Sequence, residues 1–256
     1  MKKFVFVIFL CFLVAGSSPI LAQEKSDINL DKTILEQGRI QIFTFESTPK
    51  GQGNGVKKRC VGVILIDATP AVVWEYLLQW DSMGEFVPGL EYYKTVVSLK
   101  TIEKGAVGES LIEGKLKFPV LTVKYTLKVT FDEPHFRQDW RLVTPSEVDA
   151  FSRKGIDMVR SSGGVKNIEG FEYLEPYCAG DKTIYYYAPI VETAVPMPAF
   201  VERFIMNSTL PGYMEGVKKR IESKSHPISF PKDNSSTRFR SAFAARYPGD
   251  HDKFSR

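Results

Sequence analysis

Residues 121–131 read LTVKYTLKVTF, and this stretch decides the fold class. Leucine, valine, tyrosine and phenylalanine alternate there with threonine and lysine. Successive side chains of a β-strand point to opposite faces, so the pattern predicts an antiparallel strand with one apolar and one solvent-facing side. Residues 136–144 repeat the pattern, because Gln138, Trp140 and Leu142 alternate with charged residues. We therefore expect a sheet that buries one of its faces.

Strand-like segments continue on both sides of this stretch. They cover residues 39–46, 57–67, 91–99, 105–116, 119–132, 136–144, 158–175 and 182–192. Glycine and proline within residues 48–56 predict a loop that joins the first two segments as a hairpin. Together the segments predict a curved antiparallel sheet of about six to seven strands.

Two short helices are expected after the first strands. Thr69 can cap a helix in which Pro70 takes the first position, where its missing N–H costs no hydrogen bond. A second short helix is expected over residues 82–86, and Pro88 prevents it from continuing. Residues 23–37 are polar with scattered apolar positions and form a lead-in segment or a short helix.

The last helix completes the architecture. Beyond residue 198 the apolar residues recur at helical spacing as far as Ile221, and we expect a long amphipathic helix that Pro211 and Gly212 kink or interrupt. A curved sheet cannot bury its concave face on itself, so this helix must lie across it. The sequence therefore predicts an α+β domain in which a cavity remains between sheet and helix, and concave apolar spaces are where ligands bind.

A succession of short motifs runs along this domain. They are Ile66-Asp67-Ala68-Thr69-Pro70, Val73-Trp74, Trp80-Asp81, Glu85-Phe86-Val87-Pro88-Gly89, Thr122-Val123-Lys124-Tyr125, Trp140-Arg141-Leu142, Gly163-Gly164, Thr183-Ile184-Tyr185-Tyr186-Tyr187, Pro196-Met197-Pro198 and Leu210-Pro211-Gly212. In this succession the chain resembles the START-like (SRPBCC) superfamily, which includes polyketide cyclases, coenzyme-Q-binding proteins and lipid-transfer domains. The resemblance covers residues 38–224. It implies a helix-grip fold, in which the curved sheet wraps around the C-terminal helix.

The resemblance also implies a ligand cavity lined by the concave sheet face and the underside of the last helix. Its candidate lining residues are Phe86, Val87, Leu121, Val123, Tyr125, Leu127, Trp140, Tyr186, Phe204, Leu210 and Met214. For each of them plain core packing is the alternative, because most inward apolar side chains merely fill space. The apolar segment 86–88 is either a gate at the open end of the sheet or an ordinary helix stop.

The N-terminus has the pattern of a secretory signal peptide. Lys2 and Lys3 precede an apolar run over residues 4–15, which is shorter than the roughly 20 residues of a membrane-spanning helix. We expect cleavage after Ala22, with a retained membrane anchor as the alternative. The chain then divides into a signal peptide (1–22), a lead-in (23–37), a START-like domain (38–225) and a flexible polar tail (226–256). The mature protein is expected to be exported, periplasmic or secreted, and monomeric.

The net charge of +4 does not indicate a nucleic-acid partner. Lys2 and Lys3 lie in the signal peptide, and the tail over residues 226–256 carries six basic and three acidic side chains. The body between them is close to neutral and shows no basic stripe. Cys60 and Cys178 remain after cleavage, either as a disulfide or as two separate thiols.

The sequence contains no recognisable catalytic centre. His135 is the only histidine of the body, and no clustered metal ligands, phosphate-binding loop or nucleophile motif occurs, so we expect no metal and no cofactor. Glu109, Glu113 and Asp139 lie in predicted strands, and we interpret them as solvent-facing rather than inward.

Three functions fit this pattern. The first is a carrier or binder of a lipid, isoprenoid or quinone-like molecule, which needs only an apolar pocket and a gate. The second is a polyketide cyclase or dehydratase, which needs an ionisable group inside the cavity. The third is a protein-interaction module with a collapsed cavity, whose basic tail contacts a partner or, transiently, an anionic membrane surface. We favour the first.

Overall fold

The computed structural model describes residues 28–47, 57–100, 107–118, 121–162, 165–193 and 208–224. The chain divides into two units, Met1–Leu30 and Asp31–Arg256, and all the elements below belong to the second unit. The predicted signal peptide, the glycine-rich loop over residues 48–56, Phe204 and the tail lie outside the described residues.

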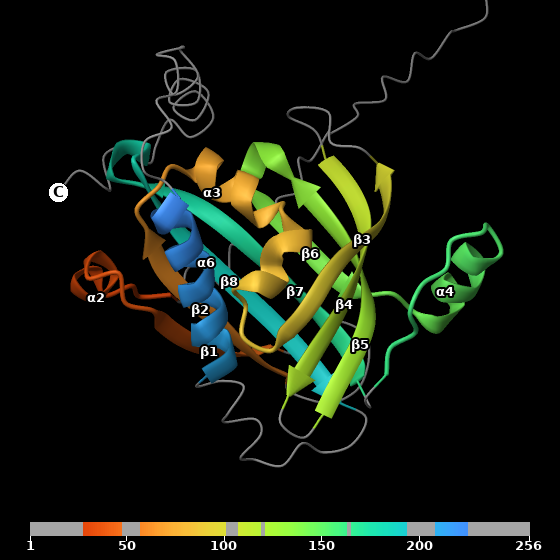
Figure 1. Ribbon diagram of the computed structural model, residues 1–256. Helices are drawn as coiled ribbons and strands as arrows, with labels where there is room; N and C mark the ends of the chain where they lie inside the picture. Colours follow the sequence, from red (N-terminus) through yellow and green to blue (C-terminus); the bar gives the residue numbers. More distant parts are fainter. Residues whose placement is uncertain are drawn as a thin grey trace, which may run out of the picture. The chain divides into compact units, whose positions relative to one another are not determined.

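One curved sheet of eight antiparallel strands forms the body of this unit (Figure 1). The strands are β1 (Gln41–Ser47), β2 (Lys57–Ile66), β3 (Leu90–Lys100), β4 (Val107–Phe118), β5 (Leu121–Asp132), β6 (Arg137–Leu142), β7 (Val165–Tyr177) and β8 (Lys182–Thr193). Their order across the sheet is β1-β2-β8-β7-β6-β5-β4-β3, so β2 pairs with the last strand of the chain. Every predicted strand is present, and the expected number of six to seven was too low.

The helices include α2 (Lys32–Glu36), α3 (Pro70–Leu77), the 3₁₀-helix η1 (Trp80–Glu85), α4 (Pro145–Ser152) and α6 (Leu210–Lys224). Helix α3 begins at Pro70 as predicted, and Thr69 takes the cap position but makes no capping hydrogen bond through its side chain. The second short helix is η1, which begins two residues earlier than expected. None of the described helices is long and apolar enough to cross a bilayer.

Helix α6 corresponds to the second half of the predicted C-terminal helix, because residues 194–207 lie outside the described part of the chain. The expected helix over residues 200–221 is observed from Leu210 onward, preceded by a π-helical turn at Ser208 and Thr209. Pro211 lies in the first turn of α6, directly after this π-helical turn, so the described backbone departs from a regular α-helix next to Pro211 and Gly212.

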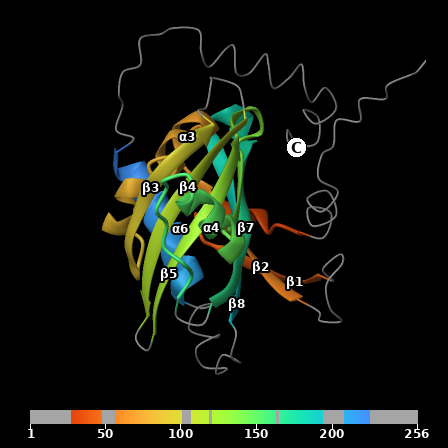
Figure 2. The same ribbon diagram turned by 90° about the vertical axis from the view of Figure 1, so that its right-hand side faces the viewer.

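The sequence analysis did not predict α4, which follows β6 and precedes β7 in the chain. It stands away from the sheet in Figure 1 and therefore lies in front of the strands in Figure 2. Its N-terminus is a capping box. The Thr144 side chain accepts a hydrogen bond from the backbone of Glu147, and the Glu147 side chain accepts one from the backbone of Thr144. Val148 of α4 packs in a small separate apolar cluster with Leu111 and Val143.

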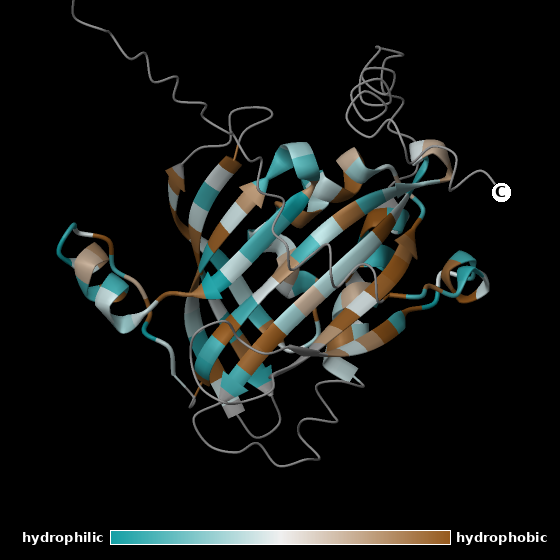
Figure 3. Cartoon of the chain, turned by 180° about the vertical axis from the view of Figure 1, so that it is seen from behind, coloured by the Kyte–Doolittle hydropathy of each residue, from teal (hydrophilic) through white to brown (hydrophobic). Residues whose placement is uncertain are grey.

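The main core lies between the inner sheet face, α3, η1 and α6. In β5 the side chains of Val123, Tyr125, Leu127, Val129 and Phe131 are all buried in it, which confirms the alternation of residues 121–131. Hydrophilic and hydrophobic residues alternate along the strands when the sheet is viewed from behind (Figure 3). The face that carries the odd-numbered residues of β5 is therefore the one that can enclose a ligand.

A further prediction concerns three carboxylates in the strands. Glu109, Glu113 and Asp139 pair across the strands with Thr130 or Thr126, on the face of β5 opposite the core. These three carboxylates therefore point away from the core, as interpreted, and all three are partly exposed.

Cys60 is buried and Cys178 is exposed, and no disulfide joins them, so of the two alternatives the structure has separate thiols.

Candidate functional site

A small chamber of about 40 Å³ lies within the core, between the inner sheet face, η1 and α6. It is lined by Trp80, Met83, Tyr93, Ile112, Leu127, Val129, Gln138, Trp140, Glu172, Tyr187 and Tyr213. These residues come from η1, from six neighbouring strands and from α6. The lining is mostly apolar and aromatic, with a few polar atoms, which is the usual composition of a small-molecule site.

An aromatic stack connects the sheet to the helix. The ring of Tyr187 in β8 lies 5.5 Å from the ring of Trp140 in β6 and 4.3 Å from the ring of Tyr213 in α6, centroid to centroid. Both pairs of rings are nearly parallel, with angles of 26° between their planes. The stack therefore fixes α6 above the sheet and forms one wall of the chamber.

Two glycines make room for the aromatic rings on the sheet. A β-carbon at Gly170 would lie 2.5 Å from the Trp140 ring, and one at Gly114 would lie 2.6 Å from the Tyr93 ring and 2.7 Å from the Tyr125 ring. Real β-carbons do not approach other atoms so closely. Glycine is therefore needed at both positions for the rings to approach the strands this closely.

Among the described residues that line the chamber, Glu172 of β7 is the only acidic one. It is 2 % exposed, and the hydroxyl groups of Tyr185 and Tyr213 are its hydrogen-bond partners. Burial raises the pKa of Glu172 to about 8, because the charged form loses its hydration, and the two tyrosine hydroxyls oppose this shift. At neutral pH the carboxyl group is therefore mostly protonated and can donate a hydrogen bond.

Gln138 of β6 lies directly opposite Glu172 in the register of the two strands. Its side chain is buried, and among the described residues its amide oxygen has no hydrogen-bond partner. Directly paired residues of antiparallel strands point to the same face, so Gln138 and Glu172 form one polar spot on the chamber wall. This spot combines a carboxylic acid with an unsatisfied carbonyl oxygen.

A second polar pair lies nearby. The Tyr125 hydroxyl donates a hydrogen bond of 3.1 Å to the Tyr93 hydroxyl, and the two rings meet edge to face. Burial raises the pKa of both tyrosines, so both remain neutral phenols at any physiological pH.

The segment after η1 packs against α6. The Arg220 guanidinium lies over the Phe86 ring, 4.7 Å from its centroid, and its Nη1 atom is 2.8 Å from Oε2 of Glu85. The Phe86 carbonyl lies so close to Gly216 that a β-carbon there would be 2.7 Å away. Arg220 therefore holds the predicted gate segment against the helix.

The predicted lining residues are distributed unevenly around this chamber. Leu127 and Trp140 line it. The buried side chains of Val87, Val123, Tyr125, Leu210 and Met214 belong to the surrounding core, and partly buried Phe86 packs against that core. Tyr186 points to the opposite face of the sheet, where its hydroxyl donates to Glu175, so its neighbours Tyr185 and Tyr187 face the core instead. The side chains of Leu121 and Phe204 lie outside the described part of the chain.

The sequence analysis did not single out Glu172 or Tyr213. Strand β7 alternates without a clear apolar side, because Gly170 and Glu172 share a face with Leu174, while Glu169 shares the other with Phe171. Only the register against β6, in which Glu172 pairs with Gln138 and Gly170 pairs with Trp140, identifies the inward face.

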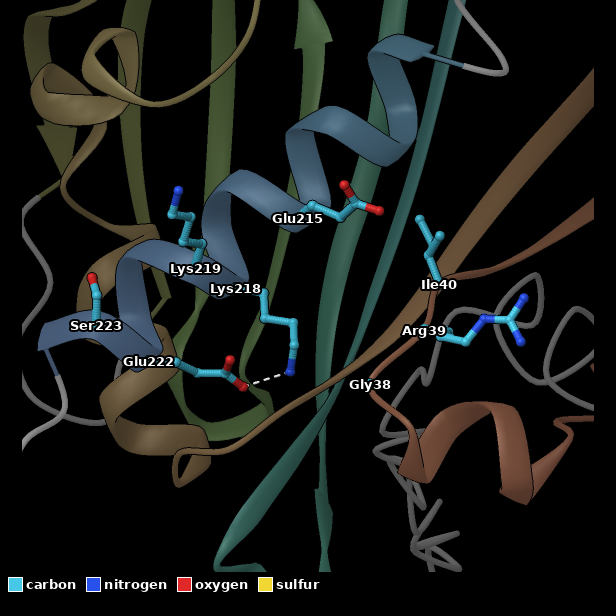
Figure 4. A pocket seen from close by; sticks show the side chains of 8 residues that line it. All are labelled: Gly38, Arg39, Ile40, Glu215, Lys218, Lys219, Glu222 and Ser223. Atoms are coloured by element: carbon cyan, nitrogen blue, oxygen red, sulfur yellow. Dashed lines mark hydrogen bonds and ion pairs between the residues drawn. The ribbon is translucent and has the colours of Figure 1, made fainter.

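A larger hollow of about 630 Å³ lies on the surface between α6 and residues 38–40 (Figure 4). Its lining includes Arg39, Glu215 and Lys219, together with the ion pair of Lys218 and Glu222, whose N–O distance is 2.5 Å. Such charged, solvated walls do not suit an apolar ligand. Among the described residues, no three histidine, cysteine or acidic side chains gather as metal ligands. The internal chamber is therefore the candidate site.

Comparison with known proteins agrees with this geometry. The family described as polyketide cyclase/dehydrase and lipid transport matches residues 66–218. No curated protein matches the sequence.

Among solved structures, the chain is similar to the Zhui aromatase/cyclase from Streptomyces sp. R1128, with 10 % identity, a TM-score of 0.50, and coverage of 68 % of this chain and 98 % of that one. A START superfamily protein from Mycobacterium smegmatis has 11 % identity and a TM-score of 0.48, with coverage of 64 % of this chain and 97 % of that one. A STAR-related lipid transfer protein from Xanthomonas axonopodis has 14 % identity and a TM-score of 0.49, with coverage of 72 % of this chain and 93 % of that one. At such identities the similarity concerns the fold alone.

Proposed function

The chain belongs to the polyketide cyclase/dehydrase and lipid transport family, and from this premise we propose that it binds an apolar small molecule between the sheet and α6. One observation carries the proposal: the walls of the chamber are aromatic and apolar except for the polar spot of Gln138 and Glu172. Transfer of a ligand from water into such walls contributes about 25 cal/mol per Å² of apolar surface.

A ligand of lipid, isoprenoid or quinone size requires the chamber to widen. Its volume of about 40 Å³ holds only one to a few water molecules. We propose that η1 and residues 86–88 move outward as a gate. Hydrogen bonds in a 3₁₀-helix such as η1 have poorer geometry than those in an α-helix, which favours η1 as the part that moves. In the closed state the contacts of Arg220 with Glu85 and Phe86 hold the segment against α6.

Native mass spectrometry of the purified protein, followed by organic extraction, tests the binding function directly. We expect a co-purifying apolar molecule, and we expect thermal stabilisation by members of a lipid and quinone panel. Val129→Phe narrows the chamber and is expected to weaken binding. Thr130→Phe places the same ring on the other face of the same strand and serves as the matched control. Repeatedly empty preparations with no thermal shift would contradict the proposal.

We propose export as the location of this function, because residues 1–22 have the composition of a signal peptide. Expression of the full chain in a bacterium that exports proteins, with fractionation and N-terminal sequencing, should give a mature protein that begins at Gln23. Recovery of a chain that retains residue 4 in the membrane fraction would favour the anchor.

A second candidate function is acid–base catalysis of the cyclase or dehydratase type, which the position of Glu172 favours. A carboxyl group with a pKa of about 8 is a stronger base than an ordinary carboxylate once it is ionised. It could take a proton from the carbon next to a ligand carbonyl and return one to it. Deuterium incorporation into 2-tetralone at pH 8, followed by NMR, tests this activity. Loss of exchange in Glu172→Gln but not in Glu109→Gln would support it, and exchange no faster than in buffer would exclude it for this probe.

A further inference from the structure

We infer that Gln138 and Glu172 bind the neutral oxygen-bearing end of an apolar ligand, such as a phenol, enol or ring carbonyl, and that the chamber rejects carboxylates and phosphates. This inference rests on the proposed binding function and names its ligand class. It assigns the polar spot a role in selecting the ligand rather than in packing alone.

The unsatisfied oxygen of Gln138 is the first argument. The side chain is 2 % exposed, lines the chamber, and among the described residues its Oε1 atom finds no hydrogen-bond donor. An unsatisfied buried acceptor costs about 1–3 kcal/mol. A ligand hydroxyl that donates to this oxygen would remove the cost, so binding of a hydroxyl is favoured over binding of bare hydrocarbon.

The protonated carboxyl of Glu172 is the second argument. The hydroxyl groups of Tyr185 and Tyr213 form hydrogen bonds with this carboxyl group and hold it in place on the chamber wall. Because burial favours the acid form, the group has a proton to donate at neutral pH. A carbonyl or phenol oxygen can accept this proton in a hydrogen bond, whereas a hydrocarbon cannot.

The charge of the lining is the third argument. Among the described lining residues there is no lysine, arginine or histidine, and the only carboxyl group is that of Glu172. A buried anion without a positive partner is strongly unfavourable, because no cationic side chain in the lining would offset its loss of hydration. Fatty-acid carboxylates and lipid phosphates are therefore unsuitable ligands for the chamber.

Three probes of the same shape test the inference: naphthalene, 2-naphthol and 2-naphthoate. Their binding to the full chain at pH 7 can be followed by quenching of tryptophan fluorescence, because Trp80 and Trp140 line the chamber. We expect 2-naphthol to bind at least about tenfold more tightly than naphthalene, which corresponds to about 1.4 kcal/mol. We expect 2-naphthoate to bind most weakly.

Gln138→Leu isolates the polar spot. It should reduce the preference for 2-naphthol over naphthalene severalfold, whereas Gln37→Leu on the surface should leave this preference and the binding of both probes unchanged. Thermal unfolding checks that both variants fold. If Gln138→Leu does not fold, the ratio of the three probes on the unmodified protein still decides the question.

The outcomes separate the inference from the function on which it rests. Equal binding of naphthalene and 2-naphthol, or tightest binding of 2-naphthoate, would overturn the inference and leave apolar binding intact. Failure of all three probes to bind would overturn both.

Discussion

Tyr187 of β8 and Tyr213 of α6 stack with their ring centroids 4.3 Å apart, and this contact joins the last strand of the sheet to the last described helix. Tyr213→Ala should destabilise the protein by about 3–5 kcal/mol, as expected when a buried aromatic ring is removed from a core. Tyr213→Phe retains the stack and should cost only about 1 kcal/mol for the lost hydrogen bond to Glu172. Urea unfolding measures both, and equal costs would show that the stack does not hold the helix.

The buried carboxyl of Glu172 should make stability depend on pH. Its pKa is raised in the folded protein from 4.5 to about 8 because of burial. The acid form is therefore favoured by folding, and the contribution is complete below pH 4.5 and is lost as the pH rises through 8. At about 1.4 kcal/mol per pKa unit the loss is on the order of 5 kcal/mol. Urea unfolding of Glu172→Gln should lack this decline between pH 5 and pH 8. Glu109→Gln, a change on the solvent-facing side, should keep it.

Gly170 and Gly62 should respond differently to alanine. At Gly170 the new methyl group would meet the Trp140 ring at 2.5 Å and the Ala188 backbone oxygen at 2.7 Å, and neither can move without disturbing the sheet. At Gly62 it would meet the flexible thioether of Met214. We expect Gly170→Ala to cost at least about 2–3 kcal/mol and Gly62→Ala clearly less. Melting temperatures would test this order, and a reversed order would refute the argument.

The capping box of α4 should determine whether this helix stays folded. Thr144→Ala is expected to cost about 1 kcal/mol, because the cap hydrogen bond is lost. Hydrogen exchange of the backbone amides in Pro145–Ser152 should accelerate, while exchange in β5 stays unchanged. The pKa of Glu147 is lowered from 4.5 to about 2, and the hydrogen bonds from Arg141 are the main cause. The ionised carboxylate therefore stabilises the folded protein fully above pH 4.5, and this contribution should be lost as the pH falls toward 2. Uniform acceleration across the sheet would contradict a local effect.

The proposed gate, formed by η1 and residues 86–88, should open faster when Arg220 is replaced. This side chain covers Phe86 and pairs with Glu85, and Arg220→Gln removes both contacts. We expect 2-naphthol to associate and dissociate severalfold faster in stopped-flow fluorescence, with a smaller change in affinity. Lys219→Gln removes a neighbouring positive charge from the same helix and should leave both rates unchanged. Unaltered rates in Arg220→Gln would place the entrance elsewhere.

The sequence predicted the sheet well because its strands follow a simple rule. In β5 every second residue is apolar, so the buried face could be identified without knowing its neighbours. The α4 helix has only eight residues, and its signal is a capping box rather than a long apolar stripe, so it was overlooked. Pro211 was expected to kink or interrupt a long helix, and the regular α-helix begins only at Leu210, after a π-helical turn.

The candidate site was harder to predict than the fold. Tyr185, Tyr186 and Tyr187 are chemically identical, and only the pairing of Tyr187 with Gly62 and Glu172 determines which of them face inward. Glu172 likewise lies among residues of mixed polarity, so its burial depends on strand register rather than on its own sequence neighbourhood. Register is a property of distant segments, and a local pattern does not contain it.

The pairing of Gly62 in β2 with Tyr187 in β8 also constrains the order in which the protein can assemble. During synthesis the hairpin of β1 and β2 leaves the ribosome long before its neighbour in the sheet exists. Non-local strand pairing of this kind slows folding and leaves strand edges temporarily open to association with other chains. The sheet can therefore be completed only after β8, which ends at Thr193, has been translated, and the nascent protein is expected to depend on chaperones until then.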